Sequence, residues 1–100
     1  MSIICAPATR TGGAIAVVRV SGEGCLALID KIFTAKSHQP LTQAKPYTLH
    51  YGEIKDMQDN TIDDVLISVF HAPNSYTGEE SAEISCHGSA YIARAIVETL

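Results

Sequence analysis

The chain has 100 residues, of which 46% are hydrophobic and 18% charged, a balance that is typical of one globular domain and excludes an intrinsically disordered chain. No apolar run approaches the roughly 18 residues of a membrane span, and MSIICAPATR at the N-terminus lacks the basic start of a secretory signal. The net charge is −4 and the seven basic residues are scattered singly, which argues against a surface that follows a nucleic-acid backbone. We therefore expect a cytoplasmic protein that does not enter the membrane.

The first half of the chain predicts two strands and a helix. Apolar residues 2–6 and 14–20 indicate strands, separated by a loop rich in Gly, Pro and Thr. Ser21 and Gly22 can cap a helix over 23–33. The apolar residues of this helix share one face: Cys25, Leu28, Ile29, Ile32 and Phe33. Residues 34–46 show little periodicity and predict a connecting loop.

The second half predicts a hairpin of strands 47–54 and 62–70, a strand over 82–87 and a helix over 90–100. The predicted fold class is α+β, in the order β-β-α-β-β-β-α, with one domain over 1–100. Such a short chain buries a small share of its surface, so support from a partner chain is plausible. The helical repeat reaches Leu100 without a stop signal, and we expect a fragment of a longer protein.

The segment PNSYTGEESAEISCHGS, from Pro73 to Ser89, carries the strongest functional signal. A turn-rich loop comes first, and the strand after it alternates between two faces. One face is apolar, and the other carries Glu83, Ser85 and His87. A polar strand face between a loop and a helix start predicts a site for a small polar ligand.

Most familiar catalytic and metal sites are excluded. The sequence has no GxxxxGK[ST] phosphate loop, no GxGxxG fingerprint, and no CxxC, HExxH or GxSxG motif. Cys86 and His87 point to opposite faces of a strand, which speaks against a shared metal ion and against a Cys86 nucleophile. We predict no catalytic residue and no metal ligand.

Ser21-Gly22-Glu23-Gly24 is interpreted as a helix cap rather than an anion site. Three distant cysteines, Cys5, Cys25 and Cys86, predict reduced thiols in the core.

Two charged residues on the predicted strands leave two interpretations open. Arg19 interrupts an apolar strand and needs an acceptor, whereas Glu83 lies on the polar face of its own strand. Each could form a structural salt bridge, with the other or with a neighbouring charge, or could hold a ligand. The remaining carboxylates of interest are expected to be solvated surface groups: Asp63, Asp64 and Glu80.

The segment GGAIAVVRVSG, from Gly12 to Gly22, followed at this interval by PNSYTGEESAEISCHGS, resembles the N-terminal domains of the MnmE (TrmE) family of tRNA modification GTPases. The resemblance runs over essentially the whole chain. It implies a tetrahydrofolate-binding domain, related in fold to the folate-binding part of the aminomethyltransferases, as a half-unit completed by homodimerisation. The ligand would be a tetrahydrofolate that carries a one-carbon unit, as the 5-formyl or 5,10-methylene derivative.

The resemblance also implies the functions of the parent protein. That protein would be a GTP hydrolase whose GTP-binding domain, absent here, depends on magnesium and potassium. With its flavoprotein partner MnmG (GidA), it would modify carbon 5 of the wobble uridine in certain tRNAs.

The family's site residues transfer onto matching positions of this sequence. Arg19 matches the arginine of the RxSG motif and Glu83 the glutamate after TGE, both of which the family uses on the folate. A pterin presents a ring N–H beside an exocyclic amine, so the carboxylate of Glu83 could accept two parallel hydrogen bonds while Arg19 donates to ligand oxygens. Secondary candidates that would shape the pocket are Thr77, Gly78, Glu79 and His87.

Two departures from the family pattern accompany these matches. The first loop, APATRTGGA, lacks the usual Pro-Pro-Gly, and His87-Gly88-Ser89 replaces the usual HGG, so that Ser89 could serve as an N-cap. Two rival functions stay open: an aminomethyltransferase-like enzyme that acts directly on a tetrahydrofolate adduct, and a pure dimerisation module.

Overall fold

The computed structural model describes residues 3–7, 15–70, 80–87 and 90–100. Its strands are β1 (Ile4–Pro7), β2 (Ile15–Ser21), β3 (Phe33–Ala35), β4 (Thr48–Lys55), β5 (Thr61–Phe70) and β6 (Ser81–His87). Its helices are α1 (Cys25–Asp30), the short 3₁₀ helix η1 (Leu41–Gln43) and α2 (Ala90–Thr99). None of these helices is long and apolar enough to cross a membrane.

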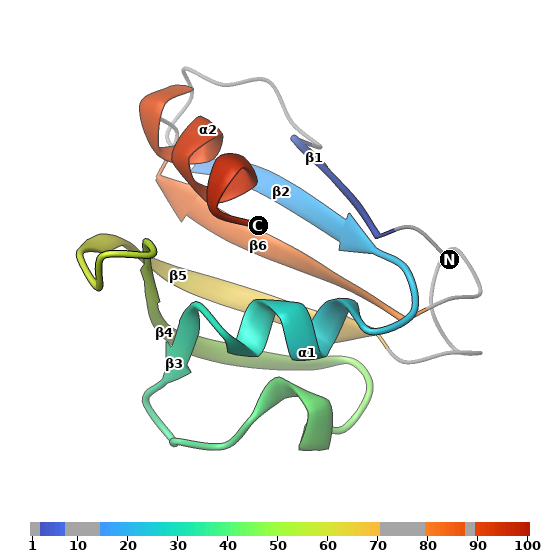
Figure 1. The fold of residues 1–100 in the computed structure, drawn as a ribbon. Coiled ribbons are helices and arrows are strands. Elements are labelled where there is room, and N and C mark those ends of the chain that lie inside the picture. Colours follow the sequence, from blue (N-terminus) through green and yellow to red (C-terminus); the bar gives the residue numbers. More distant parts are fainter. Residues whose placement is uncertain (1–2, 8–14, 71–79, 88–89) are drawn as a thin grey trace.

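Within the described ranges, the strands form one antiparallel six-stranded sheet in the order β1-β2-β6-β5-β4-β3 (Figure 1). The predicted α+β class is therefore confirmed. Strand β6 lies between β2 and β5, so the described strands of the two segments that carry the family resemblance, β2 and β6, pair side by side within the sheet.

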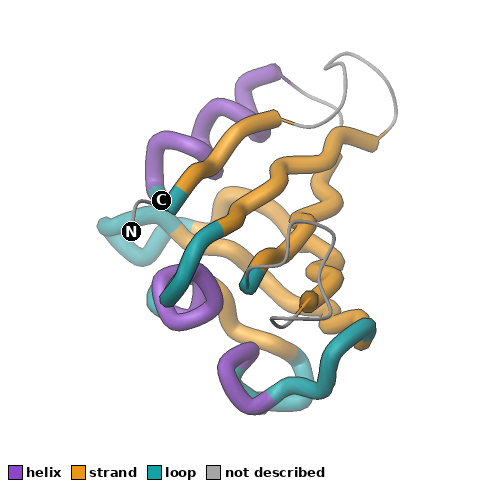
Figure 2. Tube along the Cα trace, turned by 90° about the vertical axis from the view of Figure 1, so that its right-hand side faces the viewer, coloured by secondary structure: helices purple, strands orange, loops and turns teal. Residues whose placement is uncertain are grey.

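Both α-helices pack on the same face of the sheet (Figure 2). The strand residues on that face are buried against them, and Leu26 and Ile29 of α1 and Ile96 of α2 are fully buried. Each such aliphatic side chain contributes about 1.5–3 kcal/mol to folding. The strand residues of this core include Ala16, Val18, Val20, Ile54, Val65, Ile67, Val69, Ala82, Ile84 and Cys86.

The loop before α1 explains why this helix is shorter than the predicted span of 23–33. Gly22 (φ 132°) and Gly24 (φ 86°) adopt left-handed conformations that favour glycine, so the helix begins only at Cys25. The helix ends at Asp30, and Phe33 already belongs to β3.

The prediction of a connecting loop over 34–46 is wrong in part, because this stretch contains the end of β3 and all of η1. Asp30 fixes η1: its Oδ1 accepts a 2.8 Å hydrogen bond from the backbone N–H of Leu41, and its Oδ2 a 3.3 Å bond from Thr42. Such short elements follow from long-range contacts rather than from a sequence period.

Candidate functional site

The sheet face opposite α1 and α2, called the open face below, carries the predicted site. No described helix covers it. Along β2 and β6, alternate residues face this side while their neighbours enter the core, and this confirms the predicted alternation of β6. Several large apolar side chains are exposed on the open face, among them Ile15 (66% exposed), Leu49 (62%), Tyr51 and Leu66.

Arg19 and Glu83 lie directly opposite each other on β2 and β6. Glu83 Oε2 accepts hydrogen bonds from Arg19 Nη2 at 2.7 Å and from Nε at 3.1 Å. The two side chains are 47% and 32% exposed, so this ion pair contributes about 0–1 kcal/mol to stability. The predicted bridge between these residues is thus present, and it leaves both charges within reach of solvent.

The β6 residues on the open face form a polar row that begins at Glu83 and ends at His87. The β2 residue opposite His87 is Ile15, and the one opposite Ser85 is Val17. The residue on β5 opposite Ser85 is Leu66. The row therefore has apolar borders at Ser85 and His87, whereas Glu83 has the polar neighbours Arg19 and Ser68. Such a row suits a flat ligand that has hydrogen-bonding groups on its edge.

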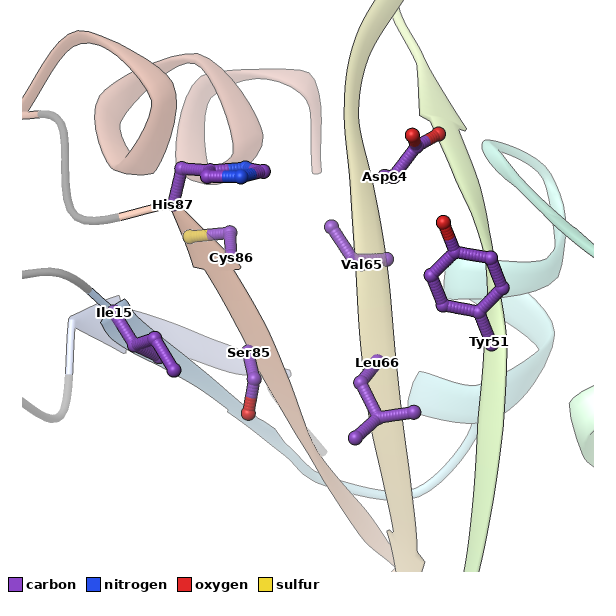
Figure 3. A pocket seen from close by; sticks show the side chains of 8 residues that line it. All are labelled: Ile15, Tyr51, Asp64, Val65, Leu66, Ser85, Cys86 and His87. Atoms are coloured by element: carbon purple, nitrogen blue, oxygen red, sulfur yellow. The ribbon is translucent and has the colours of Figure 1, made fainter.

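The strands β5 and β6 diverge beyond the pair formed by Leu66 and Ser85 (Figure 3). The space between them, called the splayed groove below, has a volume of about 230 Å³. It is lined mainly by apolar atoms, including those of Ile15, Val65 and Leu66. The His87 ring extends from β6 toward β5 at the wide end of this groove (Figure 3).

Asp63 binds His87 where the strand pairing has ended. Its Oδ2 accepts a 2.9 Å hydrogen bond from the His87 backbone N–H, and its Oδ1 lies 2.7 Å from the ring Nδ1. The side chain of Asp63 is 10% exposed and that of His87 is 70% exposed. The prediction that Asp63 is a solvated surface carboxylate is therefore wrong, whereas Asp64 is exposed as predicted.

Glu80 also departs from the prediction of a solvated carboxylate. Its Oε2 accepts a 3.2 Å hydrogen bond from the backbone N–H of Leu26, in the first turn of α1. Its backbone carbonyl accepts a 2.9 Å bond from the Gly22 N–H. Glu80 thus caps α1 and joins it to the start of β6. The N-cap position is occupied by Gly24 rather than by Ser21 or Gly22 as predicted, and the side-chain acceptor comes from Glu80.

The cysteines are free thiols with no sign of reactivity. Cys25 and Cys86 are buried and Cys5 is half-buried. Burial raises the pKa of the Cys86 thiol above its ordinary value of 9.0, the negative charge of Asp63 raises it further, and a backbone hydrogen bond lowers it in part. A raised pKa keeps the thiol protonated at neutral pH, which fits an inert core residue.

The predicted site residues fall into two groups. Arg19 and Glu83 are in contact on the open face, and His87 lies on the same face of β6, four residues further along the strand. Thr77, Gly78 and Glu79 lie outside the described residues, as does the proposed N-cap Ser89. In the part of the chain that is described, no three His, Cys, Asp or Glu side chains gather closely enough to hold a metal ion.

The sequence contains a signal that Asp63 is not a solvated surface group. Asp63 shares the strand parity of the buried residues Val65 and Ile67, and it pairs with the buried Ile54 of β4. A carboxylate on the core-facing parity of a strand requires a partner.

The family described as "GTP-binding protein TrmE N-terminus" matches residues 3–100. The chain belongs to this family. It is 51% identical over 98 residues to a tRNA modification GTPase MnmE of Bacteroides fragilis, which covers 97% of this chain and 21% of that protein. The MnmE of Christiangramia forsetii is also 51% identical over 98 residues, covering 97% of this chain and 20% of that protein.

The MnmE of Parabacteroides distasonis is 49% identical over 102 residues and covers the whole of this chain. The alignment spans 22% of that protein. This TrmE N-terminal chain therefore spans about a fifth of the length of the curated relatives that it matches.

Proposed function

We propose that this chain is the tetrahydrofolate-binding and dimerising domain of a tRNA-modifying GTPase. The observation that carries the proposal is the Arg19–Glu83 pair, which joins the two resemblance segments on the open face of the sheet. A partly exposed ion pair adds only about 0–1 kcal/mol, so stability alone is a weak reason to keep two opposite charges at this position. A ligand that binds both Arg19 and Glu83 gives a stronger reason for the presence of these two residues.

Glu83 has the chemistry to hold the pterin ring. The two bonds that Arg19 donates to Glu83 end on Oε2, and within the described residues no donor contacts Oε1. The ring N–H and the exocyclic amine of a pterin form two parallel donors that match one carboxylate. In this arrangement Glu83 binds the pterin edge, while Arg19 orients the Glu83 carboxylate and donates to oxygens of the folate.

A second copy of the chain completes the site in this proposal. The open face exposes Leu49, Tyr51 and Leu66 on β4 and β5, and Ile15 on β2 across the polar row of β6; exposed apolar patches of this kind mark interaction sites. A homodimer that covers this face removes apolar surface from water and encloses a ligand bound at Glu83.

The wider role follows the names of the relatives, which are tRNA modification GTPases. We infer that the chain presents a one-carbon unit, as 5-formyl- or 5,10-methylene-tetrahydrofolate, for the modification of carbon 5 of the wobble uridine. In this proposal the GTP, magnesium and potassium sites belong to another part of a cytoplasmic parent protein, which works with the flavoprotein MnmG on tRNA.

The test is a calorimetric titration of the chain with 5-formyltetrahydrofolate. We expect saturable heat from the wild type and none from Glu83→Ala, while Glu98→Ala, which removes an exposed carboxylate on α2, binds as the wild type does. If Glu83→Ala bound the folate as the wild type does, the assignment of Glu83 as the residue that binds the pterin would be wrong.

The ion pair and the exposed apolar face also favour a second candidate, a dimerisation module without a ligand. In that case Arg19→Ala and Glu83→Ala would each lower the melting temperature slightly, the wild type would give no heat with folate, and dimerisation would persist. The same titration therefore separates the two functions.

A further inference from the structure

The bonds between Asp63 and His87 fix the tautomer of the imidazole. An ionised carboxylate has no hydrogen to donate, so the ring Nδ1, 2.7 Å from Oδ1, must carry the proton. In a neutral imidazole the other nitrogen, Nε2, is then a hydrogen-bond acceptor. The second bond, from the His87 backbone N–H to Oδ2, holds the carboxylate in place.

The exposure of the two side chains shows which atom is available to bind a ligand. The carboxylate of Asp63 is nearly buried and both of its oxygens are used, whereas the His87 ring is 70% exposed and lines the splayed groove. Among the described residues no group bonds His87 Nε2. The hydrogen bond to the carboxylate fixes the orientation of the ring and leaves Nε2 facing solvent.

The position of His87 relates it to Glu83. Both side chains lie on the open face of β6, and four residues at about 3.3 Å each separate them by roughly 13 Å. The splayed groove beside His87 offers apolar walls to a ring. A ligand that is anchored at Glu83 and runs along β6 reaches this second place.

We propose that Asp63 and His87 form a second anchor of the ligand site, in which Asp63 is a positioning residue and His87 Nε2 accepts a hydrogen bond from an N–H or O–H group of the ligand. An aromatic or other flat part of the ligand next to that donor lies in the splayed groove. This inference rests on the proposed folate function and adds a contact that discriminates between donors and acceptors on the ligand.

The variant Asp63→Asn tests the tautomer with almost no change in shape. Asparagine has one oxygen and one NH₂ group, and its NH₂ cannot face the donating backbone N–H of His87. The oxygen therefore takes the backbone bond and the NH₂ group turns to Nδ1, which must become an acceptor. His87 then carries its proton on Nε2. The donor group of the ligand would face a second donor there, so its hydrogen bond to His87 would be lost.

The experiment combines two readouts on the whole chain. Long-range ¹H–¹⁵N spectra of ¹⁵N-labelled protein should show the Nδ1–H tautomer of His87 in the wild type and the Nε2–H tautomer in Asp63→Asn. Titration with 5-formyltetrahydrofolate should show about a tenfold loss of affinity in the variant, as expected for one lost hydrogen bond with an unpaired donor left behind.

Two further variants complete the design. Asp59→Asn removes the same charge at the exposed tip of the β4–β5 hairpin, where the left-handed backbone (φ 66°) tolerates asparagine, and it should bind as the wild type does. His87→Ala changes an exposed residue, so the fold persists, and it should lose as much affinity as Asp63→Asn does. Combining both changes should then cost no more than one alone.

Three results would overturn the inference. The Nε2–H tautomer in the wild type contradicts the assigned bonding. A switch of tautomer in Asp63→Asn with unchanged affinity shows that Nε2 does not contact the ligand, and it leaves the proposed folate function intact. The absence of any wild-type heat refutes both proposals together, and it is visible before any variant is made.

Discussion

Glu80 accepts a 3.2 Å hydrogen bond from the backbone N–H of Leu26, and this contact joins the first residues of β6 to the amino end of α1. A carboxylate at this end of a helix satisfies an otherwise unpaired donor and interacts favourably with the helix dipole. Glu80→Ala should therefore lower the unfolding free energy by about 1 kcal/mol. Thermal denaturation measures this as a drop of about 4–8 °C in Tm.

The matched control for Glu80 is Glu98→Ala, which removes an exposed carboxylate near the end of α2. Its effect should lie within about 0.5 kcal/mol of zero. Equal losses in the two variants would show that Glu80 acts through net charge rather than through the bond to Leu26.

Gly52 allows β3 to pack closely on β4. A Cβ at this position would collide with the Thr34 carbonyl oxygen and lie 2.8 Å from the Ala35 Cα, both of which are backbone atoms of β3 that cannot rotate away. Gly52→Ala should lose about 1–3 kcal/mol or more, measured by urea denaturation.

Gly24→Ala provides the comparison for Gly52, because a Cβ there meets nothing within 4 Å and only the positive φ opposes it. We expect the loss at Gly24 to be smaller. If Gly24→Ala proved the more harmful change, the close contact between β3 and β4 would be refuted.

The proposed dimer places Leu49 of β4 in the interface. Light scattering of the wild type should give the mass of two chains, and Leu49→Glu should shift the equilibrium toward one chain because a buried, unpaired carboxylate is costly. Met57→Glu is the control, since Met57 is as apolar and is 81% exposed but lies in the turn between β4 and β5. A wild type that stays monomeric at high concentration would rule out this role of the open face.

The raised pKa values of two thiols predict how the free energy of unfolding depends on pH. Burial raises the pKa of both Cys5 and Cys86 above 9.0, so near that pH the native chain binds more protons than the unfolded chain does. The free energy of unfolding should therefore fall as the pH rises from about 8 to about 10, and the fall should be smaller in a Cys5→Ala, Cys86→Ala double variant.

Alkylation gives a second readout on the same thiols. At about pH 8, iodoacetamide should label Cys86 much more slowly in native than in denatured protein, because the thiolate is the reactive form. Rapid labelling of native Cys86, detected by mass spectrometry, would mean that its thiol is neither buried nor raised in pKa.

All strands except β3 were predictable, because an apolar run or an alternating pattern marks each of them. The alternation through Glu83, Ser85 and His87 predicted which side of β6 is buried, and the polar turn 55–60 predicted the hairpin of β4 and β5. The α1 boundaries failed because Gly22 and Gly24 adopt positive φ and delay the helix, while β3 is too short to display a period.

The sequence predicts which residues of a single strand belong to the site, but it does not predict which residues of different strands meet. Arg19 and Glu83 were both identified, but their register depends on β6 pairing with β2 across 64 residues of sequence. Asp63 meets His87 only because β5 and β6 diverge beyond Ser85, and no spacing within a single segment indicates that divergence.

The two outermost strands of the sheet are short. Strand β1 has four residues and β3 has three, whereas the strands between them have seven to ten. Short outer strands present few unpaired backbone groups, so they are poor templates for adding a strand from another molecule. Growth of the sheet into fibres is therefore disfavoured. A second copy would gain far more contact by packing against a face of the sheet than by pairing with an edge strand.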